Sequence, residues 1–140
     1  MEKFLSPETI YAGVISKEIS KNFAADQLIS LIEGSNNSET RSESISILNK
    51  LRVSESKIFK LIENSLLSDE SPTVRFSAVN LIGCQFLKEG IDTLIWVVQH
   101  DKSPLVIKAI FDLNLNLANT HLKSLKKELH NYLEKIALAV

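Results

Sequence analysis

The strongest constraint on this chain is a helix-start pattern that recurs at nearly constant spacing. Its clearest copy is residues 69–82, in which Ser71 can cap a helix and Pro72 fits the first helical position, where its missing N–H costs nothing. Superposing the helix starts aligns Ser38, Pro72 and Pro104, which are 34 and 32 residues apart. A repeat of this length is typical of architectures in which pairs of helices stack on one another.

Apolar residues within the copies follow the helical period. In the central copy, one stripe combines Val74, Ala78, Leu81 and Ile82 at i, i+4, i+7 and i+8. Each copy continues through a short turn into a second helix, and such a pair cannot bury its apolar side without a neighbouring pair. No segment shows a credible strand pattern. We therefore expect an all-α fold of about eight helices in four antiparallel hairpins, with units at residues 6–34, 38–68, 71–100 and 103–140.

Composition limits both the architecture and the function. The chain has 140 residues, of which 44% are apolar and 24% charged, as in an ordinary folded domain, and we expect a single domain. The net charge of −1 disfavours broad binding to nucleic acid. The single cysteine excludes an intrachain disulfide, and we find neither a membrane-spanning run nor a secretory signal. We therefore expect a cytoplasmic protein.

The sequence shows no pattern of catalytic or metal-binding residues. Three histidines and one cysteine have no recognised ligand spacing, and His130 with Glu134 on one exposed helix makes a poor metal site. Cys84 follows Gly83 on an apolar helix, which predicts a buried and inert thiol. Four dispersed glycines form no phosphate-binding loop. We expect a protein that is not an enzyme and that binds no cofactor or metal.

The central copy resembles a known family. Its pattern Asp69-x-Ser-Pro72-x-Val74-Arg75-x-x-Ala78 is similar to the HEAT repeat, particularly the short variety found in prokaryotic proteins, and the similarity covers about residues 36–118. The resemblance implies a right-handed α–α superhelix, a HEAT-like solenoid. It also implies a protein-interaction or scaffold role in which the second helices of successive units line a concave surface.

The resemblance further implies ion pairs between an aspartate and an arginine six residues later, which join neighbouring units. Asp69 and Arg75 have this spacing. The other units break it, because Arg41 has Ser35 six positions before it and no arginine follows Asp101 at that distance. We expect a single pair, with a structural role.

Trp96 is the candidate for binding a protein partner. It lies off the apolar stripe of its helix and shares a side with Asp92, Gln99 and His100, and an exposed tryptophan within a polar rim is typical of interface hot spots. On the HEAT resemblance, the same surface would include residues of the two preceding units: Lys57, Lys60, Glu63 and Asn64 from one, and Lys21, Asp26 and Gln27 from the other. In the alternative placement, Trp96 packs under the next helix pair or under the C-terminal helix.

Three functions follow from these observations. The leading hypothesis is a non-enzymatic module that binds another protein, without contact to a membrane. The second is nucleic-acid binding or repair, because some DNA glycosylases resemble HEAT stacks and the chain has a modest basic group at Lys123, Lys126, Lys127 and Lys135. The third is a chromophore-handling role like that of phycobilin lyases, which also resemble short HEAT repeats. The apolar end at residues 136–140 either packs on the preceding helix or pairs two copies of the chain.

Overall fold

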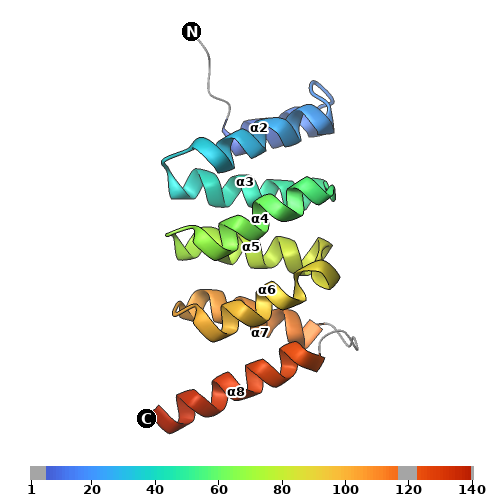
Figure 1. The fold of residues 1–140 in the computed structure, drawn as a ribbon. Helices are drawn as coiled ribbons and strands as arrows, with labels where there is room; N and C mark the ends of the chain where they lie inside the picture. The colour runs from blue at the N-terminus through green and yellow to red at the C-terminus, as the bar shows by residue number, and fades with distance from the viewer. Residues whose placement is uncertain (1–5, 117–122, 140) are drawn as a thin grey trace.

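The computed structural model describes residues 6–116 and 123–139, drawn in colour in Figure 1. These residues form eight α-helices and no strand, which confirms the all-α fold class. In chain order the helices are α1 (Pro7–Ile15), α2 (Lys21–Gly34), α3 (Ser38–Leu51), α4 (Ser56–Ser68), α5 (Pro72–Gln85), α6 (Leu87–His100), α7 (Pro104–Asn116) and α8 (Lys123–Ala139). Within these described ranges, no helix is long and apolar enough to cross a membrane.

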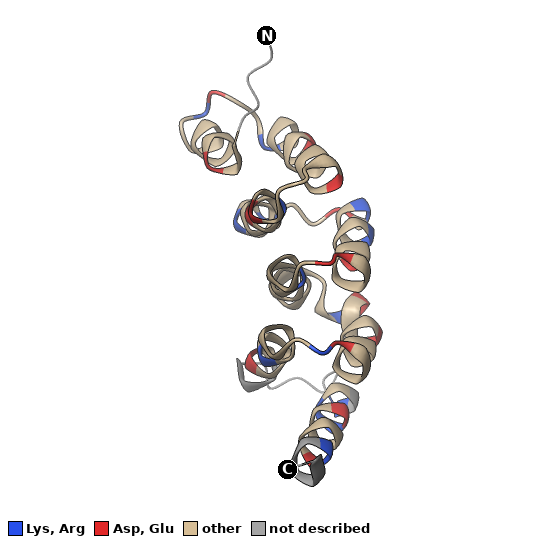
Figure 2. Ribbon diagram, turned by 90° about the vertical axis from the view of Figure 1, so that its left-hand side faces the viewer, with Lys and Arg blue, Asp and Glu red and all other residues tan. Residues whose placement is uncertain are grey.

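The helices are arranged in two layers. Figure 2 shows α1, α3, α5 and α7 stacked in one layer and α2, α4, α6 and α8 in the other. The main contacts join helices that are consecutive in the chain or separated by one helix. The structure is therefore a linear stack of helix pairs.

The two layers are packed differently. Helices α3 and α5 lie in close contact, helped by small side chains such as Ser42 and Ser77, whose hydroxyl oxygens are 2.7 Å apart. By contrast, α2 and α4 are not among the closely packed pairs. In Figure 2 the stack bows so that the second layer lies on its outer side. This differs from our expectation of second helices on a concave surface, because the first helices approach one another more closely.

The helix starts follow the capping pattern of the sequence. Side-chain oxygens of Ser6, Ser20 and Asn37 accept hydrogen bonds from backbone N–H groups in the first turns of α1, α2 and α3. Ser71 occupies the cap position of α5, but its side chain makes no capping bond. Instead, the Asp69 carboxylate accepts the N–H of Ser71 at 3.0 Å. The local turn before α5 is therefore held by Asp69.

Gly90 lies inside α6 rather than before it. The apolar stripe of Ile91, Leu94, Ile95 and Val98 predicts a helix that begins at Ile91, with Gly90 as a separator, but α6 begins at Leu87. A Cβ atom on Gly90 would lie 2.3 Å from Cγ2 of Ile82 in α5. Glycine is thus placed here by close helix packing and not by a helix end.

Three residues lie on faces other than those we expected. The helical pattern places Ser42 on the polar side of its helix with Arg41 and Glu43, but Ser42 is buried between α3 and α5. The same kind of pattern places Leu67 in the apolar stripe of Ile58, Ile62 and Leu66, but Leu67 is exposed. Cys84, expected to be buried, is exposed, and the neighbouring Gly83 is the buried residue. Helical periodicity identifies a stripe, but the neighbouring helices decide which of its edges is covered.

Candidate functional site

Two arginines connect successive helix pairs through their turns. The Arg41 Nε and Nη2 groups donate to the Asp69 carboxylate at 2.9 and 3.0 Å, and its Nη1 donates to the Ser35 carbonyl at 2.9 Å. Arg75 repeats this arrangement with the Asp101 carboxylate at 2.8 and 3.3 Å and the Asp69 carbonyl at 2.8 Å. Each arginine therefore joins the turn before its own helix to the turn of the next unit.

This geometry corrects the ion pair expected from the sequence. The Asp69 carboxylate pairs with Arg41, whereas Arg75 contacts only the backbone carbonyl of Asp69. A backbone carbonyl is available in any residue, which explains why Ser35 can stand six positions before Arg41. The sequence predicts one arginine–aspartate pair, Asp69 with Arg75, whereas the described residues form two such pairs between successive units, Arg41–Asp69 and Arg75–Asp101.

The charges of this connection shift the pKa values of its members. Burial is the largest influence on Asp69 and acts to raise its pKa, but hydrogen bonds from Arg41 and the Ser71 N–H, with the charges of Arg41 and Arg75, leave the pKa lowered. The pKa of Arg41 is raised, mainly by its hydrogen bond to Asp69. Both shifts favour the charged pair, which is consistent with a structural role.

Trp96 lies in an exposed groove between α4 and α6. Its side chain is 46% exposed, and Leu67 on α4 is 45% exposed. These two residues, with Asp92 and Thr93, line a cavity of about 330 Å³. Of the two placements considered for Trp96, the structure shows the exposed one. We call this cavity the Leu67–Trp96 groove.

The walls of the groove are held in place by local contacts. The Trp96 ring stacks on His100, with ring centroids 4.1 Å apart and planes 18° from parallel. His100 Nδ1 lies 2.9 Å from the Trp96 carbonyl oxygen and donates to it, because a carbonyl only accepts. Across the groove, the Thr93 hydroxyl donates to the Glu63 carboxylate. His100 therefore covers one face of the Trp96 ring, and the Thr93–Glu63 bond links α6 to α4 beside it.

Of the other candidate residues, Asp92 lines the groove and His100 stacks on Trp96, whereas the rest lie elsewhere. Gln99 and His100 line a second cavity, between α6 and α8. Asn64 lines a smaller one of about 300 Å³ together with residues of α2. Lys57 is exposed, and its Nζ atom lies 3.8 Å from Oδ1 of Asp26 and 3.5 Å from Oε2 of Glu55. Lys60 is also exposed.

Sequence reasoning missed two walls of the Leu67–Trp96 groove. The sequence predicts Leu67 in the core stripe, because it follows Leu66 in an apolar pattern. Thr93 carries no signal of its own, because its hydrogen bond to Glu63 joins two different units. From the sequence, only the order of the units along the stack predicts that α4 and α6 are neighbours.

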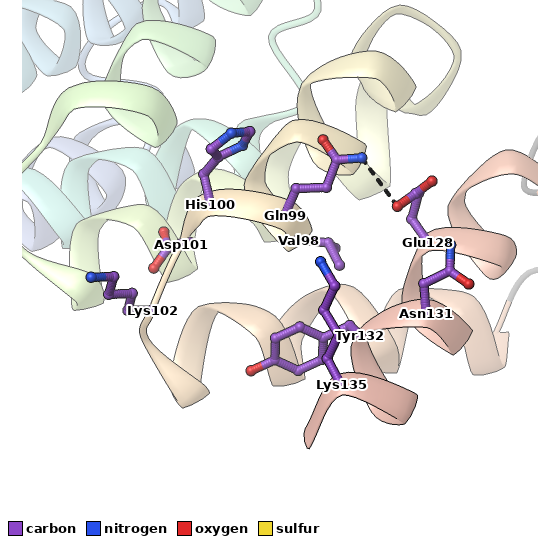
Figure 3. A pocket seen from close by; sticks show the side chains of 9 residues that line it. All are labelled: Val98, Gln99, His100, Asp101, Lys102, Glu128, Asn131, Tyr132 and Lys135. Atoms are coloured by element: carbon purple, nitrogen blue, oxygen red, sulfur yellow. Dashed lines mark hydrogen bonds between the residues drawn. The ribbon is translucent and has the colours of Figure 1, made fainter. Parts of the chain in front are cut away.

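The cavity between α6 and α8 has a volume of about 420 Å³ and is shown in Figure 3. One wall comes from the end of α6 and the turn after it, and the other comes from α8. Its lining residues are Val98, Gln99, His100, Asp101, Lys102, Glu128, Asn131, Tyr132 and Lys135.

The remaining candidate groups lie on the surface of α8 or outside the described residues. No cluster of metal-ligating side chains occurs among the residues that the structure describes. His130 and Glu134 form an exposed contact of 3.0 Å on α8. The four lysines of the candidate basic group are exposed on the same helix. The side chains of residues 136–140 lie outside the described part, and so does the proposed pairing of two copies through them.

The fold and the two cavities define a stack of helix pairs with surface openings on either side of α6. Comparison with known proteins found no matching family model, no similar curated protein and no similar solved structure.

Proposed function

We propose that this protein is a non-enzymatic, HEAT-like interaction module that binds another protein through the Leu67–Trp96 groove. The observation that carries the proposal is the exposure of two large apolar side chains, 46% for Trp96 and 45% for Leu67, at one cavity between neighbouring units. A partner that covers both side chains removes apolar surface from water, which is the main favourable term in most protein association.

The contact of Trp96 with His100 supports binding at this groove. Its ring already stacks on His100, and Thr93 already bonds Glu63, so little side-chain freedom is lost when a partner docks. Asp92 is exposed beside them and supplies a polar rim. A rigid aromatic side chain within a polar rim matches the composition of an interface hot spot.

Two features support the HEAT-like assignment and one supports the location. The helix starts at Ser38, Pro72 and Pro104 keep the repeat spacing, and arginine–aspartate contacts join successive units. The lone cysteine, Cys84, is exposed as a free thiol, which suits the reducing cytoplasm.

Affinity purification from the native organism tests the proposal. Wild type, Trp96→Ala and Leu67→Ala are compared with Phe23→Ala, which removes an aromatic side chain of equal exposure (46%) from α2. We expect a protein that is captured by wild type and by Phe23→Ala and is lost with the two groove variants. All four melting temperatures should remain similar, because the truncated side chains are half exposed.

The opposite pattern would refute this function. Capture that is unchanged by Trp96→Ala and Leu67→Ala, or reduced equally by Phe23→Ala, excludes the groove as the binding surface. A large loss of stability in Trp96→Ala would show that the side chain supports the fold instead.

A further inference from the structure

The cavity between α6 and α8 lies on the other side of α6 from the Leu67–Trp96 groove. Its volume of about 420 Å³ is within the range of small-molecule sites, about 300–1,000 Å³. Figure 3 shows Tyr132 and Lys135 extending from α8 into the space between the two helices. It is therefore large enough for a small molecule.

The acidic side chains that line the cavity are already engaged. Both carboxylate oxygens of Asp101 accept hydrogen bonds from Arg75, one of them also accepts the Ser103 N–H, and the side chain is 7% exposed. Glu128 accepts a hydrogen bond from Gln99 at 3.1 Å, drawn as a dashed line in Figure 3. Arg75 thus neutralises the charge of Asp101, whereas Glu128 keeps its charge, so the lining presents the two lysines Lys102 and Lys135 against one carboxylate.

The cationic side chains of the cavity are not engaged in this way. Lys135 and Lys102 are both exposed, and neither forms an ion pair with the residues that the structure describes. The amide of Asn131 lies one turn before Lys135 on α8 and adds a neutral hydrogen-bond donor. The polar groups left for a ligand are mainly donors.

The floor of the cavity is apolar and partly aromatic. Val98 is almost completely buried, and the partly buried Tyr132 ring is held by Phe111 at a centroid distance of 6.2 Å. A flat apolar group can lie against these two side chains, because aromatic rings favour offset or tilted contacts.

We infer that this cavity binds a small organic anion, a carboxylate carried on a flat apolar body. Lys135 pairs with the carboxylate, Asn131 donates a hydrogen bond, and the apolar body lies against Tyr132 and Val98. Charge pairing gives the orientation, and apolar burial gives most of the affinity. The inference is independent of the protein-binding groove, because none of these four residues lines that groove.

Titration with 2-naphthoate, followed by amide NMR shifts, tests the inference. Its neutral analogue 2-naphthamide keeps the flat body and removes the charge. We expect shifts at Gln99, Asn131 and Lys135, and an affinity for naphthoate about tenfold higher than for naphthamide. Lys135→Gln should weaken naphthoate binding about fivefold without changing the affinity for naphthamide.

Lys126→Gln is the matched control, since Lys126 is exposed on the same helix but does not line the cavity. It should bind naphthoate like wild type. Equal affinity for the two probes, shifts confined to other regions, no binding at all, or equal weakening by both lysine variants would each overturn the inference. Because partner capture plays no part in this titration, its outcome is separate from that of the proposed function.

Discussion

At the scale of single residues, Gly90 is placed by its neighbour in α5. An alanine in a helix interior is usually more stable than glycine by about 0.5–1 kcal/mol. Here the added Cβ would lie 2.3 Å from Cγ2 of Ile82, a fully buried, branched side chain. We expect Gly90→Ala to be destabilised by about 1–3 kcal/mol in urea unfolding, because overpacking outweighs helix propensity.

Gly34→Ala is the control for that substitution. Gly34 ends α2, and apart from its own helix backbone and chain neighbours no described atom lies within 4 Å of an added Cβ. This variant should be as stable as wild type or more stable by up to about 1 kcal/mol. If both variants had equal stability, steric contact with Ile82 would not explain the glycine.

Asp69 gives a pH-dependent contribution at the same scale. Its pKa in the folded state is lowered below the ordinary value of 3.8, so its stabilising effect is complete above that value and is lost as the pH falls through the lowered pKa. Asp69→Asn removes the charge and keeps an oxygen for the Ser71 N–H. At neutral pH, we expect the free energy of unfolding of wild type to be about 1 kcal/mol higher than that of Asp69→Asn.

Urea unfolding across a pH series measures this difference. The gap between wild type and Asp69→Asn should close in acid, because the wild-type carboxyl then becomes neutral as well. A gap that stays constant down to about pH 2 would show that the charge of Asp69 is not the cause.

At the scale of helices, the arginine contacts connect one helix pair to the next. Arg75 uses three nitrogen atoms to join Asp101 with the Asp69 carbonyl, and a lysine has one nitrogen for both. We expect Arg75→Lys to lose about 1–2 kcal/mol in urea unfolding. Arg52→Lys, at the exposed end of α3, should change stability little. Equal losses in the two variants would contradict a connecting role.

The helices themselves could be predicted from the sequence, but the contacts between them could not. Starts such as Pro72 and Pro104 depend on local backbone chemistry, and a local pattern is sufficient to find them. The Arg41–Asp69 pair joins two units. Arg41 also donates to the backbone carbonyl of Ser35, and because every residue has such a carbonyl, no residue type in the sequence predicts this contact. Trp96 could be identified from the sequence because it lies off the apolar stripe of its helix. The exposure of Leu67 could not be predicted, because it depends on where α6 lies relative to α4.

At the scale of the whole molecule, stability should follow position along the stack. The main contacts join consecutive helices or helices one apart, so each pair is stabilised by its immediate neighbours. Among the described residues, helix α5 is packed against α3, α4, α6 and α7, whereas the main contacts of α1 are with α2 and α3. The centre therefore has neighbours on both sides and the first helix pair has them on one side only.

This arrangement predicts a gradient of local opening. Native-state hydrogen exchange should show the slowest amides in α3 and α5 and faster exchange in α1 and α8, because a terminal helix can open without breaking the central contacts. Arg75→Lys should speed exchange in α7 more than in α1, since the lost contact joins α5 to the turn before α7. Uniform protection in all helices, with a uniform response to Arg75→Lys, would instead indicate one cooperative unit and would contradict a stack stabilised by nearest neighbours.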